Sequence, residues 1–196
     1  ACDQAFEDTV FPENEMVCIS QLEGMWERTV TVCSVSKGMA LSGFRVGWTY
    51  ASDVIMDVYF ACAVNIQGAT STLAQLAVMP AFRDDSFIRE YMVKYDNRRK
   101  YAYKLFNSIP GISLRMPEAG FFVWIDVSQL GDSSEITQLL VEEARVSIND
   151  GKFYGDMGNG HLRMIDGCFW EDADSYAAMD RMAETFRKLA HKKGLC

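Results

Sequence analysis

The sequence predicts an α/β chain built from two parts, a piece of a larger parallel sheet followed by a small α/β or α+β domain. The first part contains short runs of β-branched residues, such as TVTVC at residues 29–33, which are typical of buried strands. In the second part, short strand-like and helix-like patterns alternate along the chain. A length of 196 residues is sufficient for one large domain or two small ones. We place the boundary between the parts after residue 84, so that they cover residues 1–84 and 85–196.

Two strands and one connection are expected near the start of the chain. Residues 29–33 form the first strand, and residues 44–50 (FRVGWTY) form the second. Residues 37–42 lie between them and are sufficient only for a turn or a short helix. Lys37 is therefore expected on a connection that leaves a strand, which is where α/β folds place their reactive groups. The apolar residues 52–64 are expected to form a helix.

A strongly helical pattern covers residues 71–106, where apolar residues recur at helical spacing. Pro80 is expected to kink or divide this pattern, because proline lacks the N–H group that an interior helical residue donates. The charge density rises after Arg83, and Arg98 and Arg99 lie on a different face from the aromatic residues. We therefore expect a long, partly exposed helix that crosses from one domain to the other.

Four short strands and two helices are expected in the second part. The strands cover residues 112–115, 120–127, 146–148 and 161–165. Asp132, followed by Glu135, gives a capping-box signal at the start of the first helix. The second helix runs from about residue 172 to residue 189, and its stripe of methionine and aromatic residues predicts a core-facing surface. A turn at residues 149–151 and a glycine-rich loop at residues 155–160 separate the last two strands.

Composition argues against several classes of function. The net charge of −8 argues against a nucleic-acid partner, because phosphate binding needs a basic face. The six cysteines show no CxxC pair or metal-type spacing, so no metal is expected, and we interpret them as buried reduced thiols of a cytoplasmic protein. They are Cys2, Cys18, Cys33, Cys62, Cys168 and Cys196. No signal peptide or membrane-spanning apolar run is visible, so no membrane association is expected.

The stretch SVSKGMALSGFRVGW, residues 34–48, places Lys37 and Arg45 among apolar and small residues. Charged side chains resist burial unless a partner satisfies them, so the two cations either reach solvent or converge on an anion. Arginine offers a planar fork for a phosphate or carboxylate, and Ser34 and Ser36 add hydroxyl groups beside the lysine. A lysine near another cation can also lose its proton and act as a nucleophile. This set of groups suits a phosphorylated carbonyl compound, and pyridoxal phosphate fits that description.

The same stretch resembles the lysine segment of fold-type I pyridoxal-phosphate aminotransferases of class I/II, the aspartate aminotransferase group. In that family an SxSK motif is followed by a short apolar stretch and then by Gly-x-Arg-x-Gly. Two other segments resemble the family, CDQAFED, which contains Asp3, and GHLRMI, which contains Arg163. GFFVWIDV also resembles the central strand of the family's small domain. The resemblance covers essentially the whole chain, as the C-terminal portion of that family.

The resemblance implies a role for each matching residue and a cofactor, pyridoxal 5'-phosphate. Lys37 would form the Schiff base and act as the base that moves the substrate's α-proton, and Asp3 would pair with the pyridine nitrogen. Ser34, Ser36 and Arg45 would hold the cofactor phosphate, and Arg163 would bind the substrate α-carboxylate. The implied fold is a remnant of the large cofactor-binding parallel-sheet domain, residues 1–84, and the small C-terminal domain of the aspartate aminotransferase type, residues 85–196.

The chain also departs from the family pattern in two respects. Phe6 stands where the family has a tyrosine that hydrogen-bonds to the cofactor, and phenylalanine has no hydroxyl group for this. The segment that precedes the aspartate in the family, and contributes further groups to the cofactor site, has no counterpart here. We therefore expect the chain to be a fragment that is inactive on its own, from a protein that forms homodimers.

The expected function is transfer of an α-amino group between an amino acid and a 2-oxo acid. Two alternatives stay open at this point. One is a carbon–sulfur β-lyase of the same fold, and the other is a catalytically silent interaction domain, which Phe6 and the missing segment would permit. The sequence does not identify the amino acid substrate.

Overall fold

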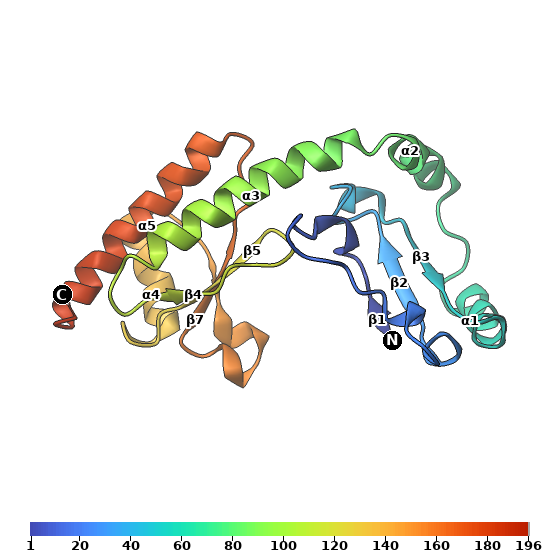
Figure 1. Cartoon of the computed structure of the whole chain (residues 1–196), viewed down its shortest axis with the longest axis horizontal. Coiled ribbons are helices and arrows are strands. Elements are labelled where there is room, and N and C mark those ends of the chain that lie inside the picture. The colour runs from blue at the N-terminus through green and yellow to red at the C-terminus, as the bar shows by residue number, and fades with distance from the viewer. Residues whose placement is uncertain (196) are drawn as a thin grey trace. The chain divides into compact units, whose positions relative to one another are not determined.

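The computed structural model describes residues 1–195 and divides into two compact units, Ala1–Met92 and Val93–Cys196 (Figure 1). The division falls within helix α3 (Ser86–Phe106), the long helix that the sequence predicts to cross between the two parts. The boundary expected from the sequence, after Asp84, falls at the end of the preceding helix.

A three-stranded sheet organises the first unit. Its strands are β1 (Cys2–Asp3), β2 (Thr31–Ser34) and β3 (Gly47–Tyr50), in that spatial order (Figure 1). The pair β1–β2 is parallel and the pair β2–β3 is antiparallel, so only part of this sheet has the parallel character that we expected. Both predicted strands are present, but β3 begins at Gly47, because Ser42–Phe44 forms a turn of 3-10 helix.

Helices α1 (Asp53–Ile66) and α2 (Thr72–Arg83) follow this sheet. The expectation that Pro80 divides the helical pattern is wrong, because Pro80 lies inside α2 and the break comes at Asp84. Asp84 leaves the helical region with φ −138° and ψ 109°, and its carboxylate accepts a 3.0 Å hydrogen bond from the backbone N–H of Ser86. The aspartate thus ends one helix and satisfies a free donor at the start of α3.

A four-stranded antiparallel sheet organises the second unit. In spatial order its strands are β4 (Ser113–Leu114), β5 (Phe122–Asp126), β7 (His161–Ile165) and β6 (Asn149–Asp150). The strand predicted at residues 146–148 and the turn predicted at residues 149–151 are both misplaced. Pairing with β7 begins at Asn149, whereas Val146 and Ile148 owe their apolar character to packing against the core.

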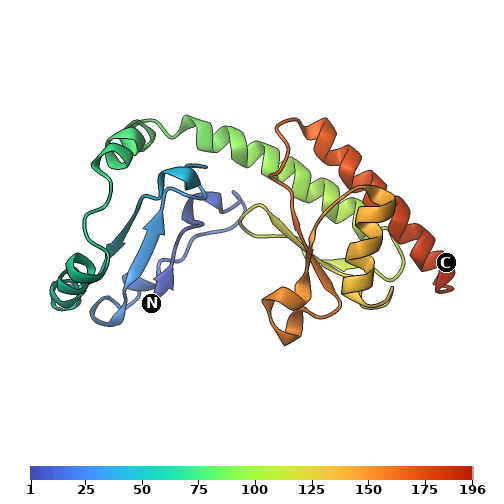
Figure 2. The same cartoon turned by 180° about the vertical axis from the view of Figure 1, so that it is seen from behind.

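Three helices cover one face of this second sheet (Figures 1 and 2). They are α3, α4 (Ser133–Leu139), which continues as a π-helical turn to Ala144, and α5 (Asp172–Lys192). The capping signal is confirmed, because the Asp132 carboxylate accepts hydrogen bonds from the N–H groups of Ser134 and Glu135. The buried stripe on α5 is also confirmed, and its core residues include Met179, Met182 and Phe186.

Helix α3 is partly exposed, as expected, but Arg98 and Arg99 on it are each only 1 % exposed. Arg98 is buried with its donors satisfied by the segment that joins β7 to α5. It donates to the carbonyl oxygens of Asp166, Phe169 and Trp170 and to the carboxylate of Asp172. These acceptors lie about seventy positions further along the chain, and a local helical pattern contains no information on them.

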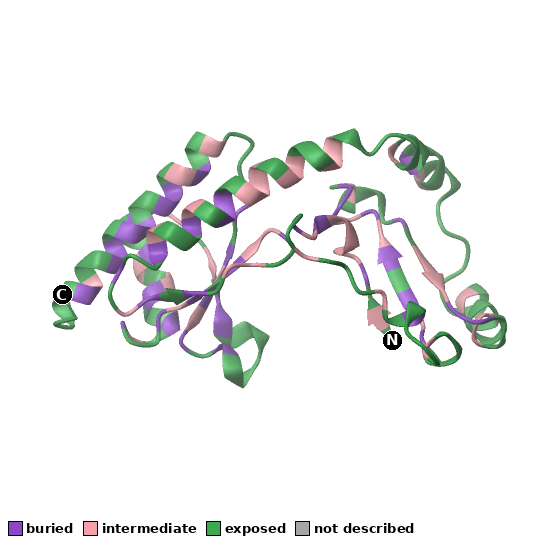
Figure 3. Ribbon diagram, viewed as in Figure 1, coloured by how far each residue is buried: buried purple, intermediate pink, exposed green. Residues whose placement is uncertain are grey.

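The cysteines only partly follow the expectation of buried thiols. Among residues 1–195 all are free, but Cys62 and Cys168 are exposed, and only Cys33 is fully buried. Cys62 belongs to helix α1, none of whose residues is buried in this structure (Figure 3). Within the same residues no group of three metal-ligating side chains occurs, and every helix is too short or too polar to cross a membrane.

Candidate active site

Sheet topology brings five of the six predicted site residues to one edge of the first sheet. Because β1 and β2 are parallel, their carboxyl ends, at Asp3 and Ser34, lie at the same edge. Strand β3 is antiparallel to β2 and begins at that edge, where Gly47 lies opposite Ser34. The connection that carries Ser36, Lys37 and Arg45 therefore starts and ends at the edge that also carries Asp3. Such an edge is a common place for a ligand site in α/β folds.

Two hydroxyl groups meet where β2 ends. Ser34 Oγ donates a 2.7 Å hydrogen bond to Ser36 Oγ and accepts a 3.0 Å hydrogen bond from the Ser36 backbone N–H. Both side chains are half-buried. The Ser34 side chain thus stabilises a short turn. The Ser36 hydroxyl proton stays available to an anion.

Lys37 is half-buried, and its side-chain Nζ makes no hydrogen bond or ion pair with any residue between 1 and 195. Its nearest described aromatic contact is Phe6, whose ring centroid lies 5.9 Å from Nζ. The next residue, Gly38, packs so closely on Asp8 that a Cβ at Gly38 would lie 2.3 Å from Asp8 Cβ. This contact fixes the backbone beside the lysine, and glycine is required there because no side chain fits.

Carboxylates gather behind this turn. Burial raises the pKa of Asp8 above its ordinary value, and the negative charges of Glu7 and Asp85 raise it further. Burial, together with Glu7, also raises the pKa of the Cys33 thiol to about 12. Cys33 is therefore a protonated, unreactive thiol at neutral pH.

Arg45 has an unusual backbone conformation, with φ 56° and ψ 41°, which is the left-handed region that few residues other than glycine adopt. Its Nη1 donates a 2.8 Å hydrogen bond to the Ser42 carbonyl oxygen, and none of the carboxylates in residues 1–195 forms an ion pair with it. Two residues later, a Cβ at Gly47 would lie 2.7 Å from the Cys33 carbonyl oxygen. The glycine thus allows β3 to approach β2 directly after the exposed arginine.

Asp3 ends β1, and its Oδ1 accepts a 2.9 Å hydrogen bond from the backbone N–H of Ala5. The side chain is exposed at the sheet edge. The adjacent Gln4 continues the pairing, since its backbone N–H donates to the Val32 carbonyl oxygen at 2.8 Å. The aspartate is therefore held by the strand and by a local turn.

Arg163, the sixth predicted residue, lies in the second unit, on β7 between Trp124 of β5 and Asn149 of β6. Its Cζ lies 3.6 Å from the ring centroid of Phe122, and its Nη1 donates a 2.8 Å hydrogen bond to the hydroxyl oxygen of Tyr154. The guanidinium is thus stacked on one aromatic ring and hydrogen-bonded to another.

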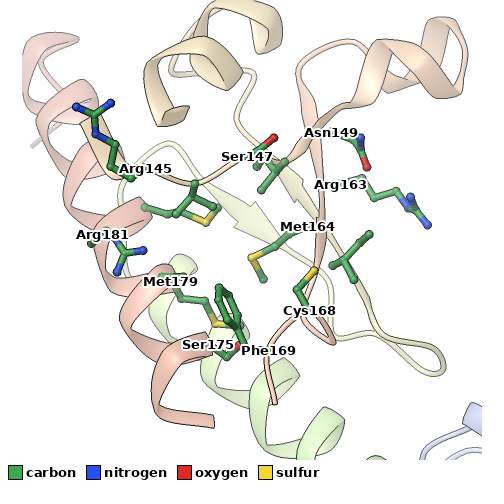
Figure 4. Close-up of a pocket in the computed structure, with 15 residues that line it drawn as sticks. Arg145, Ser147, Asn149, Arg163, Met164, Cys168, Phe169, Ser175, Met179 and Arg181 are labelled. Carbon is green, nitrogen blue, oxygen red and sulfur yellow. The ribbon is translucent and has the colours of Figure 1, made fainter. Parts of the chain in front are cut away.

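The close-up shows that Arg163 points away from Met164 and Met179, which border a cavity (Figure 4). The cavity has a volume of about 320 Å³ and a mainly apolar lining, which comes from residues 145–149, 163–165, 168–169, 175, 178–179 and 181–182. Since neighbouring residues of a strand point to opposite faces, Arg163 lies on the sheet face that the three helices leave uncovered. Phe122 and Tyr154 were not predicted as neighbours of Arg163, although alternation along β5 and β7 places Phe122 and Arg163 on one face.

The structure has an α/β fold that superimposes on about half the length of the aminotransferase structures that it matches. The chain belongs to the aminotransferase class I and II family, whose model matches residues 1–165. It is 29% identical over 190 residues to an aspartate aminotransferase of Pyrococcus abyssi, an alignment that covers 95% of this chain and 48% of the relative.

Solved structures agree with this assignment. The aromatic aminotransferase of Pyrococcus horikoshii OT3 superimposes with a TM-score of 0.86 at 26% identity, over 99% of this chain and 51% of that one. Cystalysin of Treponema denticola, whose structure contains pyridoxal 5'-phosphate, shares the fold with a TM-score of 0.83 at 18% identity, over 97% of this chain and 48% of that one. The chain therefore spans about half the length of the relatives that it matches.

Proposed function

We propose that this chain is the part of a pyridoxal-phosphate-dependent aminotransferase that carries the cofactor-binding lysine. The whole enzyme transfers an α-amino group between an amino acid and a 2-oxo acid. The observation that carries the proposal is Lys37, a half-buried lysine whose Nζ forms no hydrogen bond or ion pair among residues 1–195, on a connection that also bears Ser34, Ser36 and Arg45. An ammonium group withdrawn from water without a counter-ion is costly unless a ligand uses it.

The donor set at this edge fits a phosphorylated aldehyde. Ser34 and Ser36 contribute hydroxyl groups, and Arg45 contributes a guanidinium that no carboxylate in residues 1–195 neutralises. Together they would hold the dianionic phosphate, because charged and hydroxyl donors are strong partners of phosphate oxygens. When bound, pyridoxal phosphate supplies an electron-withdrawing ring that stabilises negative charge on the substrate's α-carbon.

The remaining residues of the proposed site bind, orient or move protons. Asp3, an exposed carboxylate at the end of β1, would keep a proton on the ring nitrogen by charge attraction. Lys37 would take the α-proton of the substrate and return it, since an amine is a suitable general base once it is deprotonated. Arg163 would bind the substrate carboxylate with its planar fork.

The domain assignment is part of the same proposal. Residues 1–84 would belong to a large cofactor-binding domain, and residues 85–196 would form the small domain. We also propose a homodimer, which the surface of α1 supports. Val54, Phe60 and Ile66 on this helix are 76 %, 68 % and 85 % exposed, which is unusual for large apolar side chains unless another protein surface covers them.

A catalytically silent domain is the second candidate, and Phe6 favours it. Phe6 presents a bare ring 5.9 Å from Lys37 Nζ, where the resembled family has a tyrosine hydroxyl group. A silent domain would keep the fold without binding the cofactor, so cofactor attachment distinguishes the two candidates.

Attachment of the cofactor to Lys37 tests the proposal directly. The chain is incubated with pyridoxal phosphate, reduced with borohydride and digested, and peptides are searched by mass for the phosphopyridoxyl group. We expect the modification at Lys37, weakened in the Arg45→Ala variant and absent in Lys37→Ala. The Lys188→Ala variant, which removes an exposed lysine of α5, serves as the control and should not change it. Equal modification of several surface lysines, with none specific to position 37, would contradict the proposal.

Transfer of the amino group is measured on the longest natural polypeptide that contains this chain. Amino acid donors are supplied with 2-oxoglutarate, and formation of glutamate is followed. If Lys37 is modified but no donor yields glutamate, the chain binds the cofactor without being an aminotransferase.

A further inference from the structure

We propose that Tyr154 is a positioning residue which, together with Phe122, fixes the guanidinium of Arg163 so that only one edge is presented to a carboxylate. This inference rests on the proposed role of Arg163 as the substrate-carboxylate receptor. It assigns a function to two aromatic residues that were not among the predicted site residues.

The hydrogen bond from Arg163 to Tyr154 selects the free edge of the guanidinium. Nη1, which lies on the Cδ side of the group, donates to the Tyr154 hydroxyl oxygen at 2.8 Å. The opposite edge carries Nε and Nη2, and neither donates to any residue between 1 and 195. These two donors point in parallel, which is the geometry that receives both oxygens of a carboxylate.

Phe122 restricts the direction from which a carboxylate can arrive. Its ring centroid lies 3.6 Å from Arg163 Cζ, a stacking distance that closes one face of the guanidinium. The Tyr154 ring lies further away, with its centroid 5.1 Å from the same atom. A ligand must therefore approach in the plane of the guanidinium, along the Nε–Nη2 edge.

Tyr154 is itself held in place, although its side chain is half exposed. It ends the short 3-10 helix Gly151–Tyr154, and its ring meets Trp124 edge-to-face at 5.8 Å. Its hydroxyl donates to Asn149 Oδ1 at 3.4 Å while it accepts from Arg163. The hydroxyl proton therefore points at Asn149, and the oxygen lone pair points at the arginine.

Fixing the arginine before the ligand arrives strengthens binding for an entropic reason. A free arginine side chain loses rotamer freedom when it is immobilised, and this loss opposes binding. If Tyr154 and Phe122 have already removed that freedom in the folded chain, the ligand does not incur the cost again. Removal of the tyrosine hydroxyl should weaken carboxylate binding by about fivefold, which is the range of one modest hydrogen bond.

The Tyr154→Phe variant tests the inference, because it removes the hydroxyl group and keeps the ring against Trp124. The chain is labelled with nitrogen-15, and the Arg163 Nε–H signal is followed by NMR during titration with 3-phenylpropionate. We expect this signal to shift in the unmodified chain, and the dissociation constant to rise about fivefold in Tyr154→Phe. The Phe122→Leu variant should weaken binding and also broaden the signal, because the stacking surface is lost. In any active longer polypeptide, Tyr154→Phe should raise KM for the amino acid and leave kcat nearly unchanged.

Tyr101→Phe is the matched control, since it also removes a tyrosine hydrogen bond in the second unit, the 2.6 Å bond to Asp180. It should leave the titration unchanged. Equal affinities of Tyr154→Phe and the unmodified chain, or no response of Arg163 to the carboxylate, would overturn the inference. Modification of Lys37 by pyridoxal phosphate is measured on the same variants. Its failure in every sample, including the unmodified chain, would count against the proposed function, whereas an intact modification with an unaltered titration would count against Tyr154 alone.

Discussion

Arg98 donates a 2.9 Å hydrogen bond to the backbone carbonyl oxygen of Asp166, and both side chains are almost completely buried. The two residues join α3 to the end of β7. Asp166 Oδ1 has no hydrogen-bond partner among residues 1–195, so the arginine satisfies the backbone of the aspartate and not its carboxylate. The segment between β7 and α5 is therefore held by a buried cation beside a buried acid.

The Arg98→Ala variant should lower the free energy of unfolding by about 3 kcal/mol, because it leaves several buried acceptors without a donor. Urea unfolding followed by circular dichroism measures this loss. The control is Arg89→Ala on the same helix, since the 2.7 Å ion pair of Arg89 with Asp85 is exposed and contributes little. Similar losses in the two variants would show that burial of Arg98 does not matter.

The Asp166 carboxyl should make stability fall with rising pH. Burial raises its pKa from 3.8 to about 7, and the charges of Arg98 and Arg99 offset only part of that effect. Since the folded pKa exceeds the unfolded one, the stabilising contribution is fully present below about pH 4 and is lost as pH rises through 7.

The Asp166→Asn variant checks this sign, because asparagine has no charge to lose. We expect the variant to gain stability relative to the unmodified chain between pH 4 and pH 8, by as much as about 4 kcal/mol. Urea titrations at several pH values measure the difference, and a constant offset from the new amide does not affect its slope. A difference that stays the same across this range would contradict a raised pKa for Asp166.

The Gly47→Ala variant should disturb the start of β3, because its Cβ would lie 2.7 Å from the Cys33 carbonyl oxygen. We expect a loss of about 2 kcal/mol in the free energy of unfolding and weaker modification of Lys37 by pyridoxal phosphate. Gly43→Ala is the control in the same motif, since no atom lies within 4 Å of its Cβ position. If both variants behave alike, the close approach of the strands is not what requires glycine.

The Asp132→Ala variant should cost about 1 kcal/mol, because α4 loses the side chain that accepts from Ser134 and Glu135 at its first turn. The Asp132→Asn variant retains a good capping residue and removes only the charge that pairs with Lys152 at 2.6 Å. We expect it to stay within about 0.5 kcal/mol of the unmodified chain, because that pair is exposed. Thermal melts distinguish the two contributions, and equal losses would assign the effect to the ion pair.

Secondary structure was predictable where it depends on a local pattern, such as alternation in a strand or a capping residue at a helix start. The alternation in GFFVWIDV and HLRMI indicated β5 and β7, and Asp132 indicated the start of α4. The pattern failed at residues 146–148, where Val146 and Ile148 are apolar because they pack on the core and not because they pair with a strand. Pro80 also misled, since it lies inside α2, which continues to Arg83.

The sequence by itself determined the motif around Lys37, the family and most helices and strands, because each of these depends on residues that are neighbours along the chain. Only the tertiary structure decided that Arg98 is buried, that Asp166 has a raised pKa, and that Tyr154 holds Arg163. Those properties depend on partners from other strands and helices, and on the water that packing removes. Local spacing contains no information about which distant groups will meet.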